Sequence, residues 1–96
     1  MLNISVRTIL GMEKYLDGRK YQVLEMPENS DVRDLLNHLE NMYGEDFKNA
    51  IFDNQGNFNK GIVLMVNGRN IMACEGLNMK LGEGDSLLIF PPAVGG

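Results

Sequence analysis

The feature that most limits how this chain can fold is an apolar run near its end that two prolines stop. Ser86-Leu87-Leu88-Ile89-Phe90 is typical of a strand, and Pro91-Pro92-Ala93-Val94-Gly95-Gly96 follows it. Proline fixes φ at about −65° and lacks a backbone N–H, so the pair ends sheet pairing and projects the next residues outward. We expect a sheet from which residues 91–96 extend as a flexible tail.

The two glycines at the end of the sequence predict a chemical use for this tail. Glycine has no Cβ, so Gly95 and Gly96 can enter a narrow channel and approach a reacting centre closely. A carboxylate on Gly96 is ionised at neutral pH and is a poor electrophile, so it needs activation, for instance as an acyl-adenylate. Two such glycines arise by chance in roughly 0.5% of chains, which favours this interpretation over a frayed end.

Nothing in the sequence can perform that activation alone. It holds no G-x-x-x-x-G-K-[ST] loop, and no G-x-G-x-x-G follows a predicted strand. His38 is the single histidine and has no companion at metal-ligand spacing, so it is interpreted as a solvated helical side chain. No Ser-His-Asp or Cys-His pair follows from spacing either. We therefore predict a chain that is not catalytic by itself and binds no cofactor or metal.

Chain length and composition further limit the class of protein to which this sequence can belong. A chain of 96 residues, 44% hydrophobic and 23% charged, is expected to form one domain with a modest core. The net charge of −4 and the lack of a basic stripe argue against nucleic acid as a partner. Cys74 is the single cysteine, which excludes a disulfide framework and favours a small, partly buried side chain. No apolar run resembles a membrane span or a signal peptide, so we predict a cytoplasmic protein without a membrane partner.

Hydrophobic periodicity in the first half of the chain predicts two strands and a helix. Residues 2–10 begin with strict alternation, and 21–25 form a second strand joined to the first by the wide loop 11–20. Ser30 is predicted to cap a helix that Gly44 ends. Apolar side chains recur on one face of this helix at steps of three and four residues: Val32, Leu35, Leu36, Leu39 and Tyr43.

The second half predicts three more strands, which gives the order β-β-α-β-β-β. A short helical turn is expected over 45–52 and a strand over 62–66. Asn67-Gly68 follows directly and predicts a hairpin turn, because both residues tolerate positive φ. Residues 69–72 would form the short return strand, and 87–90 the last strand.

The third and last predicted strands are apolar at every position, which implies cover on both faces. One main helix can cover only one face. The other face would then expose Val63 and Met65 with alternate members of 87–90, and such an apolar patch marks an interaction surface. The alternative is that loops 11–20 and 45–61 fold over it.

These residues resemble the ubiquitin-like sulfur carriers. The closest match is the small subunit of molybdopterin synthase, the MoaD type. The similarity lies in the strand order and in three segments: the run from Ile89 to Gly96, the Val66-Asn67-Gly68 turn, and Leu81-Gly82-Glu83-Gly84-Asp85 before the last strand. The thiamine-pathway ThiS type is a more distant relative. Residues 51–57 form an insertion relative to the shortest members, as in a longer MoaD-like branch. The resemblance covers essentially the whole chain.

The resemblance implies an α+β, β-grasp (ubiquitin-like) fold over residues 1–96. This fold has a mixed sheet of four to five strands with one main helix packed on one face. An enzyme of the ubiquitin-activating type would use ATP to adenylate Gly96, and a sulfur donor protein would displace AMP to leave a thiocarboxylate. The large catalytic subunit of molybdopterin synthase would then receive the tail. Gly95 and Gly96 would carry the chemistry, and the partner-binding residues would be Val63, Met65, Phe90, Pro91 and Pro92.

Two other functions remain open on the sequence. The chain can be a sulfur carrier for thiamine, cysteine or another thiolated metabolite, since the carrier chemistry is the same in each case. It can also be a ubiquitin-like protein modifier, joined through Gly96 to lysines of other proteins, or a plain interaction module.

Overall fold

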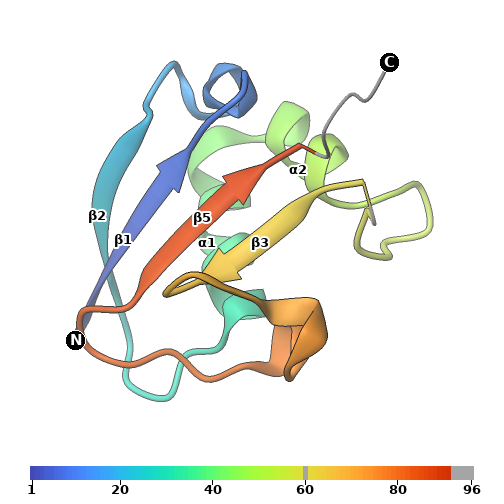
Figure 1. Ribbon diagram of the computed structural model, residues 1–96. Helices are drawn as coiled ribbons and strands as arrows, with labels where there is room; N and C mark the ends of the chain where they lie inside the picture. Colours follow the sequence, from blue (N-terminus) through green and yellow to red (C-terminus); the bar gives the residue numbers. More distant parts are fainter. Residues whose placement is uncertain (60, 92–96) are drawn as a thin grey trace.

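The computed structural model describes residues 1–59 and 61–91 of the chain and shows a sheet backed by helices (Figure 1). The strands are β1 (Leu2–Thr8), β2 (Tyr21–Met26), β3 (Val63–Val66), β4 (Arg69–Asn70) and β5 (Ser86–Phe90). The helices are α1 (Val32–Tyr43) and α2 (Glu45–Ile51), with the 3₁₀ turns η1 (Met12–Leu16), η2 (Ile71–Ala73) and η3 (Gly76–Asn78).

The sheet has the order β2-β1-β5-β3-β4, so the last strand lies at its centre. β5 runs parallel to β1 and antiparallel to β3, and the two outer pairs are hairpins. Figure 1 shows α1 and α2 together behind one face of this sheet. The predicted β-grasp fold, with a mixed sheet and a main helix on one face, is confirmed.

The two hairpins form where the sequence predicts them. Asn67 and Gly68 have φ values of 53° and 82°, the left-handed geometry that a two-residue turn between β3 and β4 requires. β4 is shorter than the predicted return strand over 69–72. Asn70 Oδ1 accepts a hydrogen bond from the backbone N–H of Met72 at 2.9 Å, which starts η2 and ends the ladder.

The N-cap of helix α1 lies one residue later than predicted. Asp31 is the N-cap: its Oδ1 accepts from the N–H of Asp34 at 2.8 Å, and Asp34 Oδ2 accepts from the N–H of Asp31 at 3.0 Å. The Ser30 prediction is wrong because the Ser30 hydroxyl donates instead to the carbonyl of Pro27, at 2.7 Å, and closes the preceding turn. Gly44 ends the helix as predicted, with a φ of 85°.

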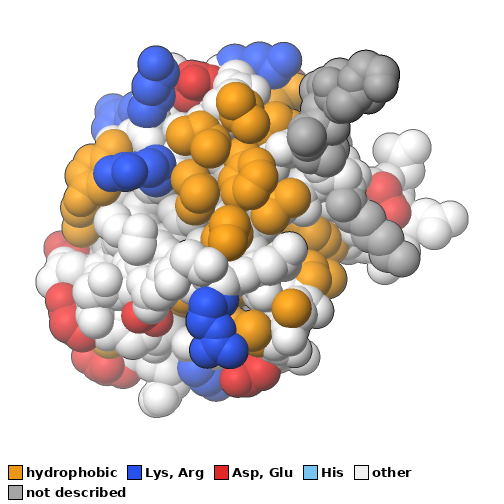
Figure 2. Space-filling model, in the orientation of Figure 1, with side chains coloured by type: hydrophobic (Ala, Val, Ile, Leu, Met, Phe, Trp, Pro, Cys, Tyr) orange, Lys and Arg blue, Asp and Glu red, His pale blue; other side chains and the backbone are white. Residues whose placement is uncertain are grey.

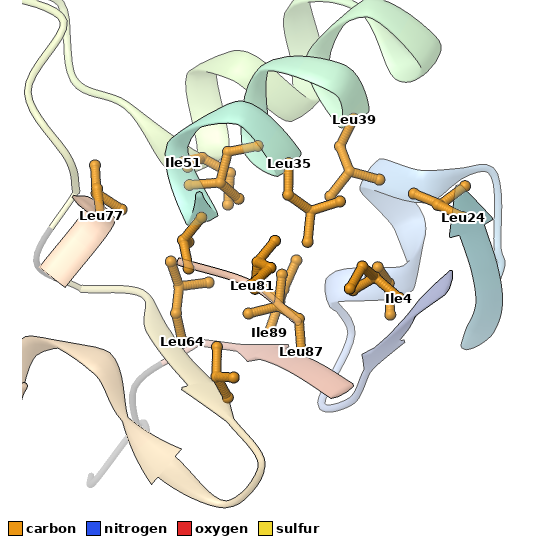
Figure 3. Close-up of a cluster of buried hydrophobic side chains, with 14 of the residues drawn as sticks. Ile4, Leu24, Leu35, Leu39, Ile51, Leu64, Leu77, Leu81, Leu87 and Ile89 are labelled. Atoms are coloured by element: carbon orange, nitrogen blue, oxygen red, sulfur yellow. The ribbon is translucent and has the colours of Figure 1, made fainter. Parts of the chain in front are cut away.

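A single core fills the space between α1 and the sheet. The predicted apolar stripe of α1 is buried, with Tyr43 partly so, and it meets the inward side chains of the central strands. In Figure 3 the labelled side chains converge on this layer from both sides. Those from the helices and η3 are Leu35, Leu39, Ile51 and Leu77, and those from the strands and the loop before β5 are Ile4, Leu24, Leu64, Leu81, Leu87 and Ile89.

The two segments predicted as possible covers of the outer face belong to this core. Residues 11–20, expected as a loop, contain η1, whose Met12 and Leu16 are buried. Helix α2 buries Phe47 and Ile51 in the same cluster. η1 and α2 therefore lie on the helical side of the sheet, and among the described residues neither α-helix covers the other face, which we call the open face (Figure 1). Cys74 also differs from prediction: it follows η2 directly and is exposed.

We expect Leu36→Ala to lower the free energy of unfolding by about 2–5 kcal/mol, because the side chain is fully buried and the change leaves a cavity. Met42→Ala is the matched control on the same helix, since Met42 is 44% exposed. Urea unfolding of both variants measures the difference. Equal stabilities for the two variants would contradict the assigned core.

Candidate functional site

The site is built around β5, the strand that carries the chain to Pro91. Leu87 and Ile89 point into the core and are fully buried, whereas Ser86, Leu88 and Phe90 point to the open face and are partly exposed. Because β5 lies between β1 and β3, its outward side chains occupy the middle of that face. Pro91 follows Phe90 and cannot continue the ladder as a donor.

Four apolar side chains form one patch on the open face. In the register of β3 with β5, Val63 lies opposite Phe90 and Met65 lies opposite Leu88. Opposed side chains on one face of a sheet lie about 4.5–5.5 Å apart at Cβ, so the four are in mutual reach. We call Val63, Met65, Leu88 and Phe90 the apolar patch. All four are half-buried, and Figure 2 shows hydrophobic side chains gathered over this part of the sheet.

Between the apolar patch and β2 lies one charged side chain, that of Arg7. Arg7 of β1 lies opposite Leu88 on one side and Tyr21 on the other, with its guanidinium carbon 5.8 Å from the centre of the Tyr21 ring. Lysine and arginine side chains border the hydrophobic cluster in Figure 2. The open face is thus apolar with basic flanks, although the whole chain is acidic.

A hydrogen-bond network fixes the start of β5. Asp85 Oδ2 accepts from the N–H of Gly82 at 2.7 Å, and Asp85 Oδ1 accepts from the side-chain amide of Asn67 at 2.9 Å. Asn67 in turn accepts from the N–H of Ser86 at 3.0 Å. The network joins the β3–β4 turn, the loop before β5 and β5 itself. The strand that leads to the tail is therefore held at its beginning.

A second contact ties the same loop to β1. Glu83 accepts from the backbone N–H of Asn3 at 3.0 Å and from the Asn3 side-chain amide at 3.2 Å, and the N–H of Gly84 donates to the Asn3 carbonyl at 2.9 Å. The two hydrogen bonds from Asn3, with the backbone one the larger contribution, lower the pKa of Glu83.

The structure places most of the predicted site residues on one surface. Val63, Met65 and Phe90 lie together in the apolar patch, and Pro91 comes directly after it. Their role in binding a partner stays a prediction. The remaining predicted site residues, Pro92, Gly95 and Gly96, lie outside the described residues.

Sequence reasoning missed the polar parts of this surface. Arg7 belongs to the alternating segment 2–10, but its position beside Leu88 depends on the parallel β1–β5 pairing. The network of Asn67 and Asp85 brings together residues 18 positions apart. A local signal existed for each residue, since Asn67 starts a hairpin turn and Asp85 ends a glycine-rich turn, but nothing in the sequence paired them.

Within residues 1–59 and 61–91, no group of three or more His, Cys, Asp or Glu side chains is arranged to hold a metal ion. His38 lies half-buried beside the apolar stripe of α1. Among the same residues, no helix has the length and apolar character to cross a bilayer.

Comparison with known sequences identifies a family. The sequence pattern of the ThiS family matches residues 8–96. A protein of Archaeoglobus fulgidus named as a candidate sulfur carrier protein is 33% identical over 69 residues. The alignment covers 72% of this chain and 77% of that protein.

Solved structures share the fold over nearly the whole chain. The small archaeal modifier protein 1 of Methanosarcina acetivorans has a TM-score of 0.84 at 26% identity and covers 100% of this chain and 98% of its own. A Pyrococcus furiosus protein named as a candidate molybdopterin converting factor subunit 1 has a TM-score of 0.76 at 25% identity. The match covers 96% of this chain and 99% of that protein. A chain of the BexX/CysO complex of Amycolatopsis orientalis has a TM-score of 0.75 at 20% identity, and the match covers 97% of this chain and 99% of that chain. Because the identity is low, this likeness shows the fold alone.

The fold and the comparisons define a ubiquitin-like carrier protein. This chain belongs to the ThiS family. Proteins of this family are carriers and not enzymes, which confirms the prediction that the chain is not catalytic by itself. The resemblance to sulfur carriers is thus confirmed at the level of the family.

We expect Asp85→Ala to lower the free energy of unfolding by about 2 kcal/mol, because two hydrogen bonds to a charged acceptor are lost at the start of β5. Glu75→Ala, which removes an exposed carboxylate from the turn before η3, serves as the control. Thermal and urea unfolding measure both. An Asp85→Ala chain as stable as the Glu75→Ala chain would show that the network does not stabilise β5.

The contact between Glu83 and Asn3 predicts a pH dependence. The folded chain lowers the pKa of Glu83 below its ordinary value of 4.5, so the stabilisation is complete above that value and is lost as the pH falls through the lower folded value. We expect Glu83→Gln to be less stable than the unmodified chain at pH 7, with the difference shrinking on acidification. Urea unfolding between pH 7 and pH 3 measures it, and a constant difference would contradict the contact.

Proposed function

We propose that this chain is the sulfur-carrying small subunit of a molybdopterin synthase, with the sulfur held as a thiocarboxylate on Gly96. The observation that carries the proposal is the position of β5: this central strand of the sheet ends at Phe90, directly before Pro91, with the apolar patch at that point. Membership of the ThiS family supports the sulfur chemistry. The likeness to the Pyrococcus furiosus protein supports the molybdopterin pathway.

The carboxylate needs two steps before it can deliver sulfur. An adenylating enzyme would join the Gly96 carboxylate to AMP from ATP and release pyrophosphate, which turns a poor electrophile into a reactive acyl group. A donor protein that supplies sulfur at the oxidation level of sulfide would then attack the acyl carbon and release AMP. One oxygen of the carboxylate leaves with AMP and sulfur takes its place.

The geometry of the described residues limits how a partner can reach the carboxylate. Five residues beyond Pro91 span at most about 16–18 Å when fully extended. A partner whose active site takes Gly96 must therefore come within that distance of Pro91, close to the surface around Phe90. The apolar patch offers that partner a buried area, and the basic flanks set by Arg7 favour acidic groups opposite them. The cytoplasmic location stays a prediction.

A protein-modifier function is the second candidate. The likeness to the small archaeal modifier protein 1 favours it, because this structure covers the whole of the present chain. In that case the activated carboxyl group would join a lysine amine through an isopeptide bond, and the same patch would serve the activating enzyme. A carrier for thiamine, cysteine or another thiolated metabolite would use the same first two steps and a different acceptor.

We expect the intact mass of the chain to rise by about 16 Da, the difference between sulfur and oxygen, after incubation with its adenylating enzyme, ATP and a sulfur donor. Mass spectrometry of the intact chain measures the change. Deleting Gly96 should abolish both the mass gain and sulfur transfer to the acceptor. A chain without Gly96 that still transfers sulfur would end the proposal.

The acceptor separates the candidate functions. The thiocarboxylated chain should convert the cyclic pterin precursor of molybdopterin when it is mixed with the large synthase subunit. Gly-Gly remnants of this chain on cellular lysines, without pterin conversion, would instead assign it as a modifier.

A further inference from the structure

A groove lies beside the apolar patch, between β3 and the segments that follow α2 and β4. Its volume is about 360 Å³. We call it the side groove. It is lined by Phe58, Ile62, Val63, Asn70 and Met72.

The lining of the side groove is suited to an apolar occupant. Met72 is 55% exposed, and Phe58 is half-buried and packs against the core with one side. Ile62 is buried. The one polar lining side chain, that of Asn70, already accepts a hydrogen bond from the N–H of Met72 at 2.9 Å. Among the described residues, no charged side chain lines the groove, so an aliphatic or aromatic group fits better than a polar one.

The wall that carries Phe58 is held by its own hydrogen bonds. Asp53 Oδ1 accepts from the N–H groups of Gln55 and Asn57, each at 2.9 Å, and the N–H of Asp53 donates to the carbonyl of Asn57 at 2.8 Å. An isolated β-bridge joins Phe52 to Phe58. These contacts form within and beside residues 51–57, the insertion relative to the shortest members of the carrier family that the sequence resembles. The groove is therefore already shaped before any partner arrives.

The side groove is continuous with the apolar patch, the surface that directly precedes Pro91. Val63 belongs to both, since it lines the groove and lies opposite Phe90 in the sheet register. A partner that reaches Gly96 comes within the short span set by the tail, so the surface around Phe90 is close enough for it to bury. A protein surface that covers Phe90 and Val63 extends over the groove at its β3 side.

We propose that the side groove takes an apolar side chain of the adenylating enzyme that activates Gly96, and that Met72 and Phe58 form the recognition contacts for it. This inference rests on the proposed function. It assigns to the side groove the selection of the adenylating enzyme. The adenylating enzyme is the occupant because every carrier function considered above requires adenylation, whereas the acceptor differs among them. An anchor side chain that fills a pocket next to an interface is a common source of binding energy.

The test is ATP–pyrophosphate exchange by the adenylating enzyme, measured at increasing concentrations of the carrier. Met72→Gln should raise the KM for the carrier about tenfold and leave kcat unchanged, because one desolvated apolar contact is lost and the tail is intact. Met72→Leu should keep the KM near that of the unmodified chain. Met42→Gln, which changes an exposed methionine on α1 in the other layer, should change neither parameter.

The outcomes separate the inference from the proposed function. Exchange by the unmodified chain, with the same KM for Met72→Gln and Met42→Gln, would overturn the inference and leave the carrier function standing. A Met72→Gln chain that is adenylated normally but no longer delivers sulfur to the large synthase subunit would show that the occupant is the acceptor, which also overturns it. No exchange with the unmodified chain would overturn the proposed function and the inference together.

Discussion

The parallel pairing of β1 with β5 is the constraint on which the rest of the structure depends. It runs from Ser5 opposite Ser86 to Thr8 opposite Ile89 and makes the last strand of the chain a central strand of the sheet. Parallel neighbours cannot be joined by a tight turn, so the helices and loops between them have to cross the sheet, and here they cover one face. The strand whose inward side chains, Leu87 and Ile89, are fully buried is therefore also the strand that leads to the tail.

A central last strand also accounts for the composition of the open face. Leu88 lies between Arg7 of β1 and Met65 of β3, and Phe90 lies opposite Val63 of β3, so both are half-buried by their neighbours in the sheet. Two polar residues of the same face, Arg7 on β1 and Asn70 on the edge strand β4, lie beside this centre. The result is an apolar centre with a polar border, the arrangement found in protein interfaces. This arrangement and the shared residue Val63 link the apolar patch to the side groove.

The sequence was sufficient for most of the fold because its local signals agree with one another. The alternation from Leu2, the apolar stripe of α1 and the Asn67-Gly68 turn each predict the element that forms there. The predictions failed where two groups compete for one role, as at Ser30 and Asp31, or where a tertiary contact decides, as for buried Met12 in a polar segment. The patch could be predicted from alternation, but its neighbours Arg7 and Phe58 could not, because they depend on pairings between distant parts of the chain.

The central position of β5 has a mechanical consequence. A partner that draws the tail into its active site pulls along the axis of β5, and the ladder bonds to β1 and β3 run across that axis. Such a load is shared among all the rungs on both sides at once, so the strand resists in shear and does not peel off bond by bond. A partner can thus bind the tail under load and release it repeatedly while the domain stays folded.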